Sequence, residues 1–288
     1  MAESYWWELV FRSINTEDPV SRKLITALTR KLPTGNASVA FLDWANHAML
    51  ANKLPSHPFD QPAGIDRLRG YLAETSREGS DHAVSAAVAL AFVPAPAEFA
   101  ALAESHPDHR VRVEFAWARA KSGDSKGVDN LVAYCSDWKT REMAASYLTE
   151  LGNGSRIPAD AVRPREAAIG KMARWLEHPN ELAELPESLE IIDHREIHWP
   201  PADRSIPVTL LRWKLGDQEG IGMTGSCTWC FFFGTQPADS VLDIYARHCN
   251  WELERDNHHL APGDNTDLEY GRSLLMRMNP AENWEATG

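Results

Sequence analysis

The stretch Asp108-His-Arg-Val-Arg-Val-Glu-Phe-Ala-Trp-Ala-Arg-Ala-Lys-Ser-Gly-Asp124 decides the fold of this chain. It opens with a residue suited to cap a helix, and apolar or small residues follow at helical spacing until Ser122-Gly123-Asp124 ends the helix. Stretches that begin at Asp81 and Asp137 align with it, at spacings of 27 and 29 residues. Second helices are expected between them, over 96–105 and 127–135. Because one helix pair cannot bury its apolar faces alone, this period predicts stacked helix pairs.

The same stretch resembles the short HEAT-like repeat of the phycobilin lyases, in which an acidic cap, Val-Arg, an alanine-rich helix and Gly-Asp follow one another. The other two repeats match it less closely, because Ser85 replaces the arginine in the first and Thr140-Arg141 replaces Val-Arg in the third. The resemblance covers roughly residues 60 to 180. It implies an α-solenoid, a fold that usually binds proteins and that carries several unrelated functions.

The rest of the chain completes the expected architecture, an α-solenoid of HEAT-like helix pairs followed by a small α+β domain. From about Leu189 the hydrophobic period changes to two, and residues 208–215 and 222–233 are predicted to form a β-hairpin. A long helix over 237–255 and a loosely ordered tail after Asn257 are expected to follow. We therefore predict a repeat domain over 1–186 and an α+β domain over 187–288. Further helices are expected over 18–32, 37–54, 63–75 and 164–177.

Composition and charge restrict the classes of partner. The chain has 29 basic and 41 acidic residues and a net charge of -12, which disfavours nucleic acid. Residues 187–288 hold 17 of the acids and 8 of the bases, a net charge of -9. No apolar run approaches the roughly 18 residues of a membrane-spanning helix, and no signal peptide is recognised. With only four cysteines, the sequence predicts a cytoplasmic protein that contacts no membrane.

Cys227-Thr-Trp-Cys230 is the one short motif with metal or redox spacing, and His248-Cys249 could complete a zinc site. In a strand, however, side chains at i and i+3 point to opposite faces, so buried structural cysteines are the favoured interpretation and zinc and redox chemistry are the alternatives. The chain has no His-Glu pair, nucleophile elbow or phosphate loop. No catalytic residue and no cofactor is therefore predicted, and an enzyme is the less favoured class.

The 11 tryptophans carry the remaining signal, because tryptophan is enriched where proteins bind one another. The first hypothesis is a non-enzymatic adaptor or inhibitor that holds another protein in its solenoid groove and on its acidic, Trp-rich end. Its partner would be cationic, and a bacterial immunity-type inhibitor is one concrete version. The alternative, from the resemblance, is a phycobilin-lyase-like protein that handles a chromophore or other ligand. The candidate partner-binding residues are Trp117, Trp138, Trp213 and Trp251.

Overall fold

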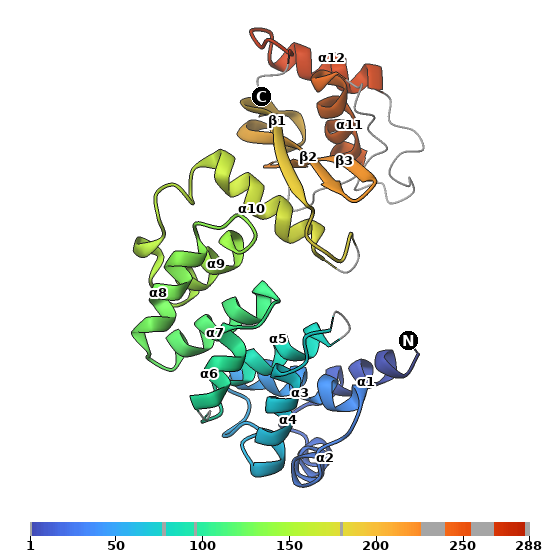
Figure 1. Cartoon of the computed structure of the whole chain (residues 1–288). Helices are drawn as coiled ribbons and strands as arrows, with labels where there is room; N and C mark the ends of the chain where they lie inside the picture. Colours follow the sequence, from blue (N-terminus) through green and yellow to red (C-terminus); the bar gives the residue numbers. More distant parts are fainter. Residues whose placement is uncertain are drawn as a thin grey trace. The chain divides into compact units, whose positions relative to one another are not determined.

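The computed structural model describes residues 2–76, 79–94, 97–178, 181–225, 240–254 and 268–285. Within these ranges the chain is rich in helix and carries a small antiparallel sheet near its C-terminus (Figure 1). Contacts divide it into two compact units. Unit 1 comprises Met1–Cys135 and Met143–Ile157, and unit 2 comprises Ser136–Glu142 and Pro158–Gly288.

The described part of unit 1 is helical, and its helices begin and end within a few residues of the predicted ones, apart from α1, which was not predicted. Three of its helices begin at an aspartate whose carboxylate accepts a backbone N–H of the first turn: Asp18 from Ser21 at 2.7 Å, Asp108 from Arg110 at 2.8 Å and Asp124 from Lys126 at 3.0 Å. The helices are α1 (Ala2–Arg12), α2 (Pro19–Arg30), α3 (Asn36–Leu50), α4 (Pro62–Leu72), α5 (Ser80–Ala89), α6 (Ala97–Glu104), α7 (His109–Lys121), α8 (Ser125–Tyr134) and α9 (Arg141–Glu150), of which unit 1 holds the part from Met143.

The two aspartates that align with Asp108 do not cap their helices. Asp81 lies inside the first turn of α5, whose N-cap is Gly79. Asp137 accepts the N–H of Lys139 at 3.1 Å in a turn that precedes α9. Each of the three aligned stretches thus contains a helix, but only the middle one begins at the expected aspartate cap.

Packing in unit 1 follows a simple order. Helix α3 contacts α1 and α5, α5 contacts α7, and α4 and α6 pack beside them. The alanines of α5 at 83, 86 and 87 are fully buried, which lets neighbouring helices approach closely. At Gly127 of α8 a Cβ atom would lie 2.3 Å from the backbone N of Ala120, so the α7–α8 contact requires glycine.

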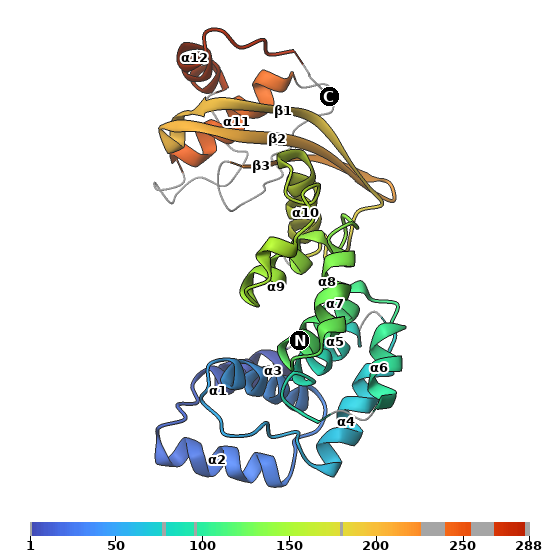
Figure 2. The same cartoon turned by 90° about the vertical axis from the view of Figure 1, so that its left-hand side faces the viewer.

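Unit 2 is built on a sheet of three antiparallel strands in the order β1-β2-β3, which lie side by side in Figure 2. The predicted hairpin corresponds to β2 and β3, which are joined by a tight turn in which Gly216 has φ of 57°. The second strand begins at Gln218 and not at residue 222, and residues 226–233 of the predicted strand lie outside the described residues. The prediction missed β1. The elements of unit 2 are α10 (Pro164–Leu176), β1 (Ser188–Trp199), β2 (Arg204–Leu215), β3 (Gln218–Thr224), α11 (Val241–Glu254) and α12 (Leu268–Met278).

Both faces of this sheet are covered. Helix α10 packs on one face through Met172, which approaches β3 so closely that a Cβ at Gly222 would lie 2.5 Å from its Cε. Helices α11 and α12 cover the other face, where Val208 and Tyr245 belong to a second apolar cluster. A bulge at Ile192 shifts the β1–β2 register and reverses which face the following residues occupy.

Two expectations for the C-terminal part differ from what is observed. The boundary was expected between residues 186 and 187, whereas contacts place residues 158–186 with unit 2, because α10 packs on the sheet. The tail after Asn257 was expected to be loosely ordered, whereas residues 268–278 form α12, whose Leu275 is fully buried. Close contact at Gly271, where a Cβ would lie 2.5 Å from the carbonyl oxygen of Ala246, joins α12 to α11.

Candidate binding groove

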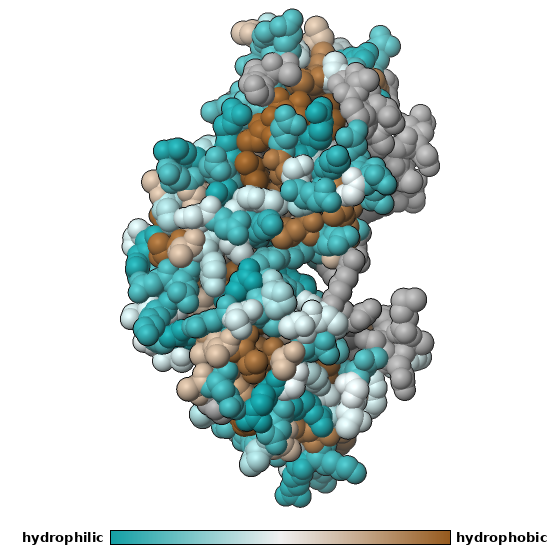
Figure 3. Space-filling view, viewed as in Figure 1, coloured by the Kyte–Doolittle hydropathy of each residue, from teal (hydrophilic) through white to brown (hydrophobic). Residues whose placement is uncertain are grey.

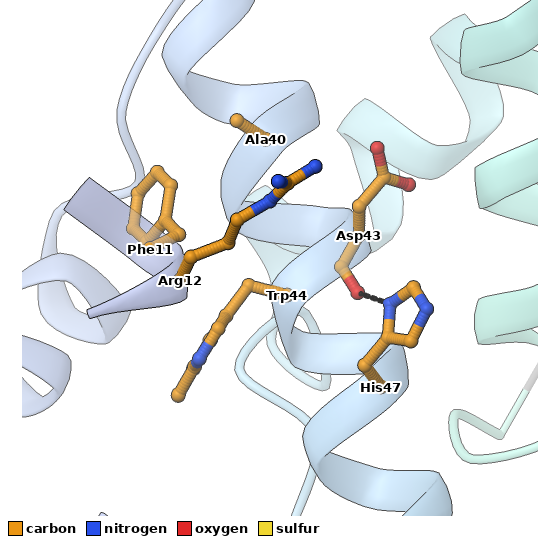
Figure 4. A pocket seen from close by; sticks show the side chains of 6 residues that line it. All are labelled: Phe11, Arg12, Ala40, Asp43, Trp44 and His47. Atoms are coloured by element: carbon orange, nitrogen blue, oxygen red, sulfur yellow. Dashed lines mark hydrogen bonds between the residues drawn. The ribbon is translucent and has the colours of Figure 1, made fainter. Parts of the chain in front are cut away.

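Two adjoining cavities of unit 1 share Asp43 and His47, and we call them together the inner groove. The larger, of about 560 Å³, is lined from α3, α5, α7 and α9 by Asp43, Asn46, His47, Leu50, Val84, Ser85, Val88, Glu114, Trp117, Lys121, Tyr147 and Glu150. The smaller, of about 490 Å³, is lined from α1 and α3 by Phe11, Arg12, Ala40, Asp43, Trp44 and His47 (Figure 4).

Asp43 occupies the centre of the inner groove, where α3 meets α5. The Ser85 hydroxyl donates a hydrogen bond to its Oδ1, and the Asn46 side chain donates to the Ser85 carbonyl oxygen at 2.9 Å. Its Oδ2 accepts no hydrogen bond from any residue that the structure describes. Burial raises the pKa of this carboxyl group, because the hydrogen bond from Ser85 and the charge of His47 compensate only part of the lost hydration.

A buried histidine, His57, holds the side chain of Asn46 in place. His57 accepts the backbone N–H of Phe59 on Nδ1 at 3.2 Å and therefore carries its proton on Nε2, which donates to Asn46 Oδ1 at 3.1 Å. Burial lowers the pKa of His57 to about 4. The neutral ring thus fixes the Asn46 amide, and Asn46 in turn joins α3 to α5 through the Ser85 carbonyl oxygen.

At the α7–α9 end of the inner groove, each acidic side chain has a hydrogen-bond or ion-pair partner. The Tyr147 hydroxyl donates to Glu114 at 2.5 Å, and Trp117 Nε1 donates to Glu150 at 3.3 Å. Lys121 Nζ lies 3.7 Å from Glu150 and 5.1 Å from the centre of the Trp117 ring. The Trp117 and Tyr147 rings contact each other, with centroids 5.5 Å apart.

The α1 end is aromatic and carries one arginine. The Trp44 ring is stacked on Phe41 at a centroid distance of 5.7 Å, and His47 Nδ1 donates to the Asp43 carbonyl oxygen at 2.8 Å. Figure 4 shows Arg12 extending from α1 across the cavity toward the side where Asp43 lies. The inner groove thus combines aromatic and aliphatic walls with a carboxylate at its centre.

Of the four tryptophans predicted to bind a partner, the structure places only Trp117 in the inner groove, where it is 2% exposed. Trp138 is half-buried in unit 2, with Lys139 Nζ 5.5 Å from its ring centre. Trp213 lies in the interior, 6% exposed, in the cluster that includes Met172. Trp251 is half-buried on α11.

The predicted zinc alternative falls partly outside the described residues, because Cys227 and Cys230 are not among them. In α11, Cys249 packs in the apolar cluster with Tyr245, and burial raises the pKa of its thiol to about 12, so it is protonated. Burial also lowers the pKa of His248 to about 3. The described ranges contain no group of three or more His, Cys, Asp or Glu side chains that could hold a metal ion. The zinc site stays a prediction.

Sequence reasoning missed Asp43, Asn46, His47 and Ser85. One signal was available at the other end of the groove: Glu114 falls within the apolar stripe of α7, between Val111 and Phe115, and is only 7% exposed. A carboxylate in such a stripe has either a buried partner or a ligand. No comparable signal marks Asp43, whose contacts come from a helix about 40 residues further along the chain.

No protein-family model, no curated protein and no solved structure matches this chain. None of the helices in the described ranges is both long and apolar enough to cross a bilayer. Fold and groove alone therefore define its class, a helix-rich protein with a small antiparallel sheet and a groove in its helical unit.

Proposed function

We propose that this chain is a non-enzymatic protein-binding protein of HEAT-like type, an adaptor or inhibitor, which holds a segment of another protein in the inner groove. The observation that carries the proposal is the groove itself, which is lined by every second helix from α1 to α9 and not by a single helix pair. Such concave surfaces across stacked repeats are the usual binding surfaces of solenoids.

The contacts between successive helices support the solenoid part of the proposal. The guanidinium of Arg110 at the start of α7 bridges the Asp108 carboxylate of its own repeat, at 2.8 Å, and Asp81 of the preceding repeat, at 2.9 Å. Ser80 also donates to Asp108. These contacts join the starts of α5 and α7, at aligned positions of the first two repeats.

The size of the inner groove fits an extended peptide segment. Its larger cavity alone is lined by four helices, which at about 9 Å apart span about 27 Å and match about eight residues at 3.3 Å each. Figure 3 shows that hydrophilic side chains cover most of the visible face of unit 1, with apolar side chains confined to patches. Among the apolar residues that line the groove, Leu50 is 40% exposed.

Site-specific photo-crosslinking in the native host tests the proposal. A benzoylphenylalanine at Leu50 of the groove is compared with one at Ala133, which is exposed on α8 and outside the groove. We expect one protein to crosslink at Leu50 and not at Ala133, and Val88→Glu to abolish that product while the far-ultraviolet circular dichroism stays unchanged.

Two results would overturn the proposal that the inner groove binds a protein segment. Equal crosslinking at both positions would show that the groove is not the binding surface. Visible absorbance of the purified protein, lost in Val88→Glu, would instead favour the phycobilin-lyase-like alternative, in which the groove holds a coloured ligand.

A further inference from the structure

We infer that Asp43 is the binding site for a cationic side chain, so that the segment held in the inner groove is basic and inserts one arginine or lysine between α3 and α5. The inference rests on the proposed function. It adds the chemical class of the segment and names the residue that selects it.

The electrostatics of the groove single out Asp43 among its acids. Glu150 has Lys121 and Trp117 as partners, and Glu114 accepts a hydrogen bond from Tyr147. Asp43 is half-buried and has only the Ser85 hydroxyl, and no described residue forms an ion pair with it. A partly dehydrated carboxylate with an open oxygen gains more from an incoming cation than an exposed one does.

The carboxylate is also held in place before any ligand arrives. Ser85 orients Oδ1, Asn46 holds Ser85, and His57 holds Asn46. Because this chain of hydrogen bonds fixes the Asp43 side chain, little conformational entropy is lost when a ligand binds. Oδ2 is the atom left for the ligand.

The walls on both sides suit the stem of a long basic side chain. Leu50, Val84 and Val88 line the groove next to Asp43, and the Trp44 ring lies on the α1 side. Arginine and lysine cover apolar surface with their methylene groups and keep their charge at the polar end. An aspartate between apolar walls matches that shape.

Other charged groups lie near Asp43. Arg12 and His47 line the smaller cavity with Asp43, and the charges of His47 and His82 favour its ionised form. Lys121 is already held by Glu150. The net charge of -12 attracts a basic segment from a distance.

A randomised octapeptide display library, selected on the full chain, tests the inference. We expect wild type to enrich peptides with arginine or lysine at one position. In the best peptide, replacing that arginine with the isosteric neutral citrulline should weaken binding about tenfold in fluorescence anisotropy.

Variants of the protein separate the role of Asp43 from general charge. Asp43→Asn should bind the arginine and citrulline peptides equally, whereas Asp129→Asn, which removes an acid that is 61% exposed on α8, should keep the tenfold difference.

The outcomes distinguish this inference from the proposed function. Enriched peptides without a basic preference, or a preference that survives in Asp43→Asn, would overturn the role of Asp43 and leave the groove as a peptide-binding surface. A library without any enriched peptide, together with no groove-specific crosslink, would overturn both.

Discussion

Each of the two units contains an aspartate shielded from water, and the two carboxylates differ in how many hydrogen-bond donors surround them. In unit 2, Asp193 is fully buried; Arg195 donates to its two oxygens at 2.6 and 2.5 Å, and the Tyr245 hydroxyl donates at 2.8 Å. In unit 1, Asp43 has one hydroxyl donor and an oxygen that faces a cavity. A carboxylate closed on all sides holds a fold together, whereas one left half-open is available to a ligand.

The contacts around Asp193 show which segments of unit 2 this hydrogen-bond network joins. Arg195 also donates to the carbonyl oxygens of Asn283 at 2.7 Å and Glu285 at 3.0 Å, and its guanidinium lies 5.2 Å from the centre of the Trp284 ring. Asn279 exchanges two hydrogen bonds with the backbone of His198. The network therefore fastens the segment that follows α12 to β1.

The largest loss of stability is expected when the hydrogen-bond network around Asp193 is disrupted. Arg195→Leu leaves Asp193 as a buried charge without its partner, which should lower the free energy of unfolding by about 3–5 kcal/mol. Urea denaturation followed by tryptophan fluorescence measures this change. The matched control is Arg163→Leu, which removes an exposed pair with Asp160 and should cost less than about 1 kcal/mol. Equal losses in the two variants would mean that the network does not stabilise unit 2.

A smaller loss of stability is expected at acid pH, where the buried His57 would have to be protonated. In the unfolded chain the pKa of His57 is near 6.5, and in the folded chain burial lowers it to about 4. The stabilisation by neutral His57 is therefore complete above pH 6.5 and is lost as the pH falls toward 4, at about 1.4 kcal/mol per pH unit. Urea denaturation of wild type at pH 7, 6 and 5 should show this slope.

The control for the acid effect is His57→Gln, which keeps a side-chain amide for Asn46 but does not titrate. Its free energy of unfolding should fall less steeply over the same interval. Because His248 also has a lowered pKa, the difference between the two slopes, and not the slope of wild type, isolates His57. Parallel slopes would contradict the assignment of a neutral His57 to the folded chain.

The smallest effect on stability is expected at Asp43. Because burial raises its pKa, ionised Asp43 opposes folding, so Asp43→Asn should leave the free energy of unfolding unchanged or raise it by up to about 1 kcal/mol at pH 7. The same denaturation assay measures it. A loss comparable to that of Arg195→Leu would mean that Asp43 is structural, like Asp193, and would remove the contrast between the two units.

The sequence predicted the helices better than the sheet, for a physical reason. Spacing and capping residues such as Asp108 and Asp124 are local signals, and they located most helices of unit 1 to within a few residues. Strand β1 was missed because the bulge at Ile192 interrupts its alternation and because Asp193 and Arg195 place charges on its buried side. Helix α12 was missed because its burial depends on α11 and the sheet, which lie far away in the sequence.

Of the four tryptophans named from the sequence as candidate partner-binding residues, only Trp117 lines the inner groove. Its central residue depends on the pairing of α3 with α5, which brings Ser85 to Asp43 across 42 positions. Helical periodicity shows which face of each helix is apolar. It does not show which polar residue of one helix meets which residue of the next, and this determines whether a carboxylate is left open.

The two-sided covering of the sheet also affects the order in which the chain can fold during synthesis. Helix α10 is made before the strands and can cover one face as soon as they emerge, whereas the other face has to wait until α11 and α12 have been translated. Translation proceeds at about 5–20 residues per second, and domains generally fold as units as they emerge. Residues up to 157 can therefore complete unit 1 first, while the nascent sheet stays exposed on one side until the last helix arrives.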